Sequence, residues 1–123
     1  MDKLHIGIDL GGTKIESVVL DSKLNVLFRE RVPTESSKGS THVMNQIEKI
    51  YSKAVTSINN KTHTLGIGTP GSISKNTGLL RNSTILCQNG LPIDKLIEKK
   101  LKRPIIIEND ANCFTLAEAT IGS

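Results

Sequence analysis

Three strand-like segments fill the start of the sequence, before any helical pattern appears. From Leu4 to Leu10 apolar residues alternate with His, Gly and Asp, which is the period of a β-strand. The segment "IESVVLD" follows after "GGTK", and "VLFRERVP" follows after "SKLN". Connections this short join antiparallel neighbours. The chain is therefore predicted to begin with a three-stranded meander.

A helix and a buried strand are predicted next. After the turn-rich loop "PTESSKGST", apolar residues recur at helical spacing from Val43 to Ile58, with Ser40 or Thr41 available as the N-terminal cap. The segment "LGIGTPG" has the pattern of a short buried strand. The span 72–90 has no regular period and is predicted to be irregular.

The last part of the sequence predicts a helix, a strand and a second helix. "IDKLIEKKLK" carries an apolar stripe and begins just after Pro92, a residue suited to a helix start. "PIIIEN" is apolar on both faces, which favours a central parallel strand covered by helices on each side. "ANCFTLAEATIG" predicts a closing helix. The order β-β-β-α-β-α-β-α indicates an α/β fold with a mixed central sheet.

Length and charge limit the number of domains and the class of partner. A chain of 123 residues is enough for one core, so residues 1–123 are predicted to form a single unit. The net charge is +4, and the densest basic run is "KLIEKKLKR". Its apolar residues have helical spacing and no aromatic residue is interleaved for base stacking. This run is interpreted as a solvated helix face, and no nucleic-acid partner is expected.

The cysteines and the N-terminus favour a cytoplasmic protein. Cys87 and Cys113 belong to no CxxC pair and are expected to be free thiols in a reducing compartment. The sequence enters its first strand without a charged and apolar leader. No apolar run approaches the length needed to span a membrane, so no membrane association is expected.

The turn "DLGGTK" is a candidate anion-binding site. Its two glycines let backbone N–H groups approach a bulky anion, Thr13 adds a hydroxyl and Lys14 adds a positive charge. It matches neither the P-loop nor GxGxxG, and a plain hairpin turn is the alternative. However, Asp9 lies beside it, and a carboxylate next to an anion is repulsive unless a cation such as Mg²⁺ lies between. The combination predicts a site for a metal-bound nucleotide.

Three segments together carry a family resemblance. "IGIDLGGTK" resembles the first phosphate motif of the actin, Hsp70 and hexokinase superfamily, in the form typical of the ROK family of bacterial sugar kinases and sugar-responsive repressors. "GIGTPGSI" and "ENDANCFTLAEA" also resemble ROK segments, in the same order. Within that family the sequence is most similar to the bacterial fructokinase, or mannofructokinase, branch. The resemblance implies the N-terminal lobe of a ribonuclease H-like kinase of the actin/hexokinase type.

The resemblance assigns a role to each matching residue. It implies a phosphate turn for ATP, a sugar-binding set and one catalytic carboxylate. The turn comprises Gly11, Gly12, Thr13 and Lys14, with Asp9 facing Mg²⁺ through water, and the sugar-binding set comprises Gly71, Ser72, Asn82 and Asn109. Asp110 is implied as the general base, which accepts the proton of the sugar hydroxyl and orients its oxygen. Because Asp110 also precedes a helical pattern, capping of that helix is the alternative role.

Three classes of function are compatible with these residues. The leading prediction is ATP-dependent phosphorylation of a hexose, fructose or mannose at the 6-hydroxyl; glucokinase and N-acetylhexosamine kinase are the enzymatic alternatives. A ROK transcriptional repressor is the second class, but such proteins carry a DNA-binding module ahead of this lobe, and here a strand begins within five residues of Met1. A non-catalytic nucleotide- or sugar-binding module is the third, and the pair Asn109 and Asp110 argues against it.

The segment "RNSTILCQNGLPIDKL" resembles the fructokinase branch but departs from its pattern at two positions. Asn82, Asn89 and Gly90 are in register, but Thr84 stands where asparagine is typical and Gln88 stands where an aliphatic residue is typical. These departures leave the identity of the sugar open. The sequence ends before the family's second phosphate loop and the ligands of its structural zinc site, so zinc is expected only in a second lobe. We therefore expect a fragment without turnover alone, and homodimer formation stays open.

Overall fold

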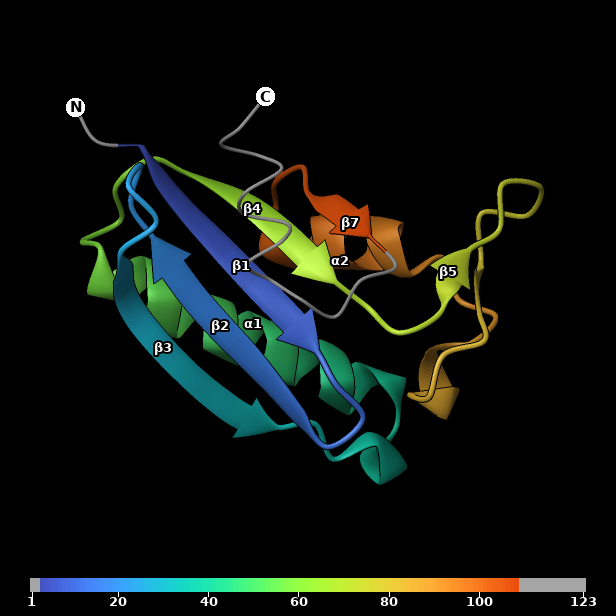
Figure 1. Cartoon of the computed structure of the whole chain (residues 1–123). Helices are drawn as coiled ribbons and strands as arrows, with labels where there is room; N and C mark the ends of the chain where they lie inside the picture. The colour runs from blue at the N-terminus through green and yellow to red at the C-terminus, as the bar shows by residue number, and fades with distance from the viewer. Residues whose placement is uncertain (1–2, 109–123) are drawn as a thin grey trace.

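The computed structural model describes residues 3–108 and shows a five-stranded sheet with two helices on one face (Figure 1). The strand order is β3-β2-β1-β4-β7. The sheet strands are β1 (Leu4–Leu10), β2 (Lys14–Leu20), β3 (Val26–Pro33), β4 (His63–Gly68) and β7 (Ile106–Glu108). The helices are α1 (Ser40–Ser57) and α2 (Ile93–Leu101), and the short elements are η1 (Ser36–Lys38), β5 (Ser72–Ile73), β6 (Leu80–Arg81) and η2 (Leu86–Gln88).

The pairing confirms a mixed sheet that begins with an antiparallel meander. β1 pairs with β2 and β2 pairs with β3, both antiparallel. β1 also pairs with β4, and β4 with β7, both parallel. Parallel neighbours need a crossover connection, which α1 and α2 supply. Because β1, β4 and β7 run in the same direction, their carboxyl ends meet at one edge of the sheet.

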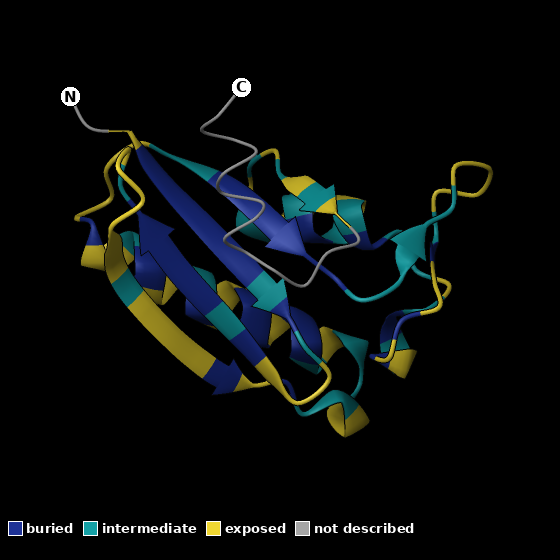
Figure 2. Ribbon diagram, in the orientation of Figure 1, coloured by how far each residue is buried: buried dark blue, intermediate teal, exposed yellow. Residues whose placement is uncertain are grey.

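The core lies between the sheet and the two helices. One face of β1 packs with buried residues of both helices, such as Ile47 of α1 and Ile97 of α2. Figure 2 shows the ribbons of β1 and β4 mostly buried and the outer strand β3 mostly exposed. Each fully buried aliphatic side chain contributes about 1.5–3 kcal/mol. An aliphatic core of this kind holds the strand ends at the sheet edge in fixed positions.

The start of α1 differs from the predicted cap. Gly39, with φ of 98°, occupies the cap position, and no side chain caps the helix. The carbonyl of Gly39 accepts a hydrogen bond from the backbone N–H of Val43. Ser40 and Thr41 are therefore already inside the first turn, and the prediction that either one caps the helix is wrong. The preceding turn η1 brings the chain into α1 at Gly39 instead.

Two predictions for the second half need correction. The span 72–90 is not wholly irregular, because β5 and β6 form a two-stranded antiparallel ribbon and η2 follows it. β7 is parallel to β4 as predicted, but within residues 3–108 it is an outermost strand of the sheet, not a central strand. Ile106 is accordingly 48 % exposed. The predicted closing helix lies outside the described residues.

The structure also bears on the expectations about membrane spans and cysteines. No helix within residues 3–108 is both long and apolar enough to cross a membrane. Cys87 is a half-buried free thiol, whereas Cys113 lies outside the described residues.

Candidate functional site

The candidate site lies at the edge of the sheet where the three parallel strands end. Asp9 of β1 pairs in register with Gly68 of β4, and Gly68 pairs with Glu108 of β7. Alternation places these positions on the face opposite the core side chains of β1. The backbone N–H of Thr69 donates a hydrogen bond of 3.0 Å to the carbonyl of Glu108 and joins the ends of β4 and β7.

The proposed catalytic pair follows this point in the sequence. Asn109 and Asp110 come directly after Glu108, the last residue of β7, but both lie outside the described residues. Their roles as sugar ligand and general base therefore stay predictions. Open α/β sheets bind ligands outside the carboxyl ends of their strands, so the end of β7 is at the appropriate edge for such a pair.

The glycine turn between β1 and β2 has free hydrogen-bond donors. The Gly11 N–H donates to the carbonyl of Lys14 at 2.9 Å, and a Cβ on Gly11 would lie 2.7 Å from that oxygen, so glycine is required there. Gly12, Thr13 and Lys14 are exposed. Within the described part of the chain, the backbone N–H groups of Gly12 and Thr13 have no acceptor. Exposed N–H groups beside a lysine suit an anion such as a phosphate.

Thr34 and Gln46 hold this turn in place, and the sequence patterns identified neither residue. The buried Thr34 donates from its hydroxyl to the carbonyl of Gly11 at 2.7 Å, and its N–H donates to the carbonyl of Thr13 at 2.9 Å. The Gln46 side chain of α1 donates to the carbonyl of Pro33 at 2.7 Å. The turn is thus fixed from the end of β3. Thr34 lies in a segment whose composition predicted only a surface loop.

Asp9 lies beside the turn with a second carboxylate as its neighbour. It is half-buried, and it pairs in register with Glu16 of β2. Cross-strand partners point to the same face, and like charges there repel. Carboxylate oxygens are the ligands that Mg²⁺ prefers, so a cation at this position fits the donor set. Within residues 3–108, no group of three or more His, Cys, Asp or Glu side chains is arranged to hold a metal ion.

The structure brings the other predicted sugar-site residues together. Gly71 has φ of 81°, and a Cβ there would lie 2.8 Å from the backbone nitrogen of Ser83 and 3.0 Å from the carbonyl carbon of Asn82. Ser72 pairs with Arg81 in the ribbon of β5 and β6. Gly71, Ser72 and Asn82 therefore belong to one packed unit. Asn82 has φ of 60° and is exposed.

This unit also reaches the glycine turn. A Cβ on Gly12 would lie 3.7 Å from the hydroxyl oxygen of Thr84, which is exposed. Thr84 is one of the two departures from the fructokinase pattern. It lies between the predicted phosphate turn and the predicted sugar-binding segment.

Gln88, the second departure, is fully buried. Neither its Oε1 nor its Nε2 has a hydrogen-bond partner in the described structure. A buried unpaired amide costs about 1–3 kcal/mol, which explains why an aliphatic residue suits this position. Gln88 makes no direct contact with solvent, so it does not line the candidate site.

A separate polar cluster lies at the opposite end of β4. The Tyr51 hydroxyl lies 2.6 Å from His63 Nε2, and His63 Nδ1 lies 2.8 Å from the carbonyl of Lys61. Because a carbonyl only accepts, Nδ1 carries the proton and Nε2 accepts from Tyr51. Burial lowers the pKa of His63, and the positive charge of Arg103 lowers it further. Burial also lowers the pKa of His5, with a smaller contribution from Lys3.

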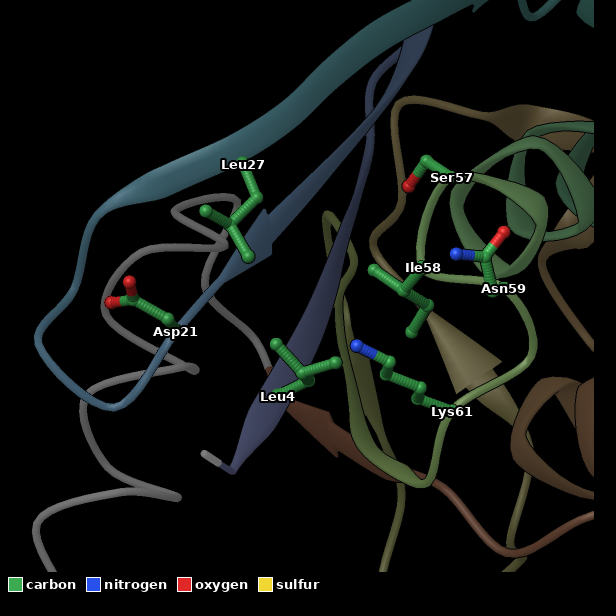
Figure 3. A pocket seen from close by; sticks show the side chains of 7 residues that line it. All are labelled: Leu4, Asp21, Leu27, Ser57, Ile58, Asn59 and Lys61. Atoms are coloured by element: carbon green, nitrogen blue, oxygen red, sulfur yellow. The ribbon is translucent and has the colours of Figure 1, made fainter. Parts of the chain in front are cut away.

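One cavity of the described structure lies away from the candidate site. It has a volume of about 390 Å³ and lies near the start of β1, where Figure 3 shows Leu4, Leu27 and Ile58 on its walls. Its acidic residue, Asp21, already accepts hydrogen bonds of 2.9 Å from the N–H groups of Lys23 and Asn25. The carboxylate of Asp21 therefore stabilises its own turn, and no glycine within residues 3–108 lines the cavity.

Comparisons with known proteins add independent information. Residues 5–123 match the family model described as "ROK family". The chain is 36% identical over 116 residues to an N-acetyl-D-glucosamine kinase of Haemophilus influenzae, covering 94% of this chain and 38% of that protein. The chain thus spans well under half the length of this curated relative.

Two solved structures are similar in fold and sequence. A ROK family glucokinase of Streptomyces griseus, in complex with glucose and AMPPNP, has a TM-score of 0.72 at 25% identity, over 98% of this chain and 37% of that chain. An inorganic polyphosphate/ATP-glucomannokinase of Arthrobacter sp. strain KM has a TM-score of 0.74 at 30% identity, over 98% of this chain and 49% of that chain. These matches confirm the actin/hexokinase-type fold.

The relatives do not confirm the predicted branch. They are named as an N-acetyl-D-glucosamine kinase, a glucokinase and a glucomannokinase. They favour the alternative of a glucokinase or N-acetylhexosamine kinase over the fructokinase branch, which finds no support. The glycine turn, the packed unit around Gly71 and the matched family model agree with one another. The chain belongs to the ROK family.

Proposed function

We propose that this chain is the N-terminal lobe of an ATP-dependent hexose kinase whose first candidate substrate is N-acetylglucosamine, followed by glucose. The observation that carries the proposal is the meeting of three segments at one sheet edge. These segments are the glycine turn after β1, the Gly71 unit after β4 and the end of β7, which precedes Asn109 and Asp110.

The glycine turn would bind the phosphates of ATP. The N–H groups of Gly12 and Thr13, which have no acceptor within residues 3–108, and the charge of Lys14 suit the phosphate oxygens. Asp9 would face Mg²⁺ through water. Bound ATP supplies the phosphoryl group, and Mg²⁺ neutralises negative charge on the phosphate oxygens. Thr34, which hydrogen-bonds Gly11 and Thr13, would keep these donors oriented without reorganisation.

Asp110 would act on the sugar hydroxyl. A sugar alcohol is a weak acid, so the carboxylate accepts its proton as the oxygen attacks and, equally, holds that oxygen in line with the phosphorus. Asn109 would donate to or accept from a neighbouring hydroxyl. Capping of the following helix by Asp110 is compatible with this role, because a carboxylate has two oxygens that accept hydrogen bonds.

The choice of sugar rests on the relatives and on the segment that differs from the fructokinase pattern. The N-acetyl-D-glucosamine kinase of Haemophilus influenzae supports an N-acetylated hexose, and the Streptomyces griseus glucokinase supports glucose. Thr84, exposed beside Gly12, replaces the asparagine expected in a fructokinase. This departure removes one feature of the fructokinase pattern and does not itself select another sugar.

The test is a substrate panel with the full-length protein that carries this chain. Phosphoryl transfer from ATP to N-acetylglucosamine, glucose, mannose and fructose is measured by a coupled assay for ADP. The expected result is the highest kcat/KM for N-acetylglucosamine or glucose, with loss of activity when Mg²⁺ is removed. A highest kcat/KM for fructose would restore the fructokinase reading, and the absence of transfer to any hexose would reject the kinase.

A further inference from the structure

Asn89 makes two hydrogen bonds to the backbone of a single residue six positions earlier. Its Oδ1 accepts from the N–H of Ser83 at 2.9 Å, and its Nδ2 donates to the carbonyl of Ser83 at 3.0 Å. Only one orientation of the amide satisfies both groups, because a backbone N–H only donates and a carbonyl only accepts. One side chain therefore replaces the strand partner that Ser83 lacks.

The two hydrogen bonds between Asn89 and Ser83 lie where the chain leaves the ribbon of β5 and β6. β6 ends at Arg81, and the backbone of Ser83 is the next to be hydrogen-bonded in the described structure. The hydroxyl of Ser83 in turn accepts from the N–H of Ile85 at 3.0 Å. Ser83 is only 4 % exposed, so water has little access to replace Asn89.

Ser83 separates the two exposed residues of the candidate sugar segment. Asn82, with φ of 60°, precedes it, and Thr84, beside Gly12, follows it. The backbone nitrogen of Ser83 also faces Gly71, whose missing Cβ leaves the necessary space. The position of Ser83 therefore determines where the side chains of Asn82 and Thr84 lie relative to the glycine turn.

We propose that Asn89 is a positioning residue for sugar binding, acting through Ser83 on Asn82 and Thr84. This inference rests on the proposed function as a hexose kinase. Without Asn89, two buried backbone groups lose their partners, and such groups are costly when left unpaired. The segment then shifts so that these groups reach water, and Asn82 and Thr84 move with it. The glycine turn is braced separately by Thr34, so phosphate binding is retained.

The test compares three variants of the full-length protein. Asn89→Ala removes both hydrogen bonds, and Asn89→Asp keeps the acceptor for the Ser83 N–H but places an oxygen against the Ser83 carbonyl. Asn76→Ala is the matched control, since Asn76 is an exposed asparagine in the turn of the same ribbon and its side chain bonds nothing in the described structure. KM for the sugar, KM for ATP and the calorimetric Kd for the sugar are measured for each.

The expected result is a rise of about tenfold in KM and Kd for the sugar in Asn89→Ala, with KM for ATP changed by less than about twofold. Asn76→Ala should match the wild type. If Asn89→Ala does not fold, Asn89→Asp is measured in its place with the same expectation. A sugar KM and Kd within about twofold of wild type in the folded variant would overturn the proposal.

Failure of the proposed function has a separate signature. If the wild-type protein binds a hexose but transfers no phosphate, the kinase is rejected, while the sugar Kd of Asn89→Ala still decides the positioning role. If the wild-type protein neither binds nor phosphorylates a hexose, both proposals are overturned.

Discussion

Replacement of Gly71 by alanine tests the packing of the candidate sugar segment. At φ of 81°, an L-residue costs about 1–2 kcal/mol relative to glycine. The added Cβ would also lie 2.8 Å from the Ser83 nitrogen and 3.0 Å from the Asn82 carbonyl carbon. Both are backbone atoms that cannot rotate away, and overpacking of this kind costs about 1–3 kcal/mol. The sum predicts a loss of about 2–5 kcal/mol in the free energy of unfolding.

Gly78 provides a matched control in the same ribbon. It has φ of 72°, and a Cβ there would meet no atom within 4 Å. Gly78→Ala therefore carries only the backbone term, about 1–2 kcal/mol. The difference between the two variants isolates the contact between Gly71 and the segment 81–83.

The assay is urea denaturation of the full-length wild type and both variants, together with the sugar KM. Gly71→Ala should be less stable than Gly78→Ala by about 1–3 kcal/mol and should have a raised sugar KM. Equal stability and equal sugar KM in the two variants would refute the reasoning, since the close approach of Gly71 to Ser83 would then have no energetic consequence.

Three further predictions concern buried and half-buried polar side chains. Gln88→Leu should raise the free energy of unfolding by about 1–3 kcal/mol, because it removes two unpaired buried atoms at similar volume. A lower free energy of unfolding in urea denaturation would indicate that the amide has a partner. Thr34→Val should raise KM for ATP but not for the sugar, because only the bond to Gly11 is lost, whereas an unchanged KM for ATP would separate Thr34 from phosphate binding. The lowered pKa of His63 predicts that the free energy of unfolding falls as the pH drops below about 6.5, because the unfolded chain then binds more protons. His63→Gln should weaken this pH dependence in urea titrations. An unchanged slope of the free energy of unfolding against pH would contradict the prediction.

Local patterns in the sequence were sufficient for much of the fold. The alternation from Leu4 to Leu10 and the helical spacing after Val43 depend on neighbouring residues, and both elements are confirmed. The cap of α1 was not predictable in this way, because Gly39 is reached through the turn η1. The position of β7 as an outermost strand also depends on which strands lie beside it, and a run of isoleucines does not contain that information.

In the candidate site, too, features set by local backbone geometry were predictable and features set by tertiary contacts were not. The glycine turn and Gly71 have sequence signatures that arise from backbone geometry, so they were identified. Thr34 and Asn89 act through hydrogen bonds across 23 and six positions, respectively. Their roles depend on which loops meet in space, so Thr34 appeared only as a loop residue and Asn89 only as a residue in register with the family.

The most direct test of the account is the activity of Asp110→Asn in the full-length protein. The amide keeps the size of the side chain and removes the base, so phosphorylation of the preferred sugar should fall by at least about 10²-fold while the calorimetric sugar Kd stays close to that of wild type. Glu48→Gln, an exposed change on α1, serves as the control for an altered charge. Turnover of Asp110→Asn near the wild-type rate would contradict the account and leave Asp110 as a helix cap.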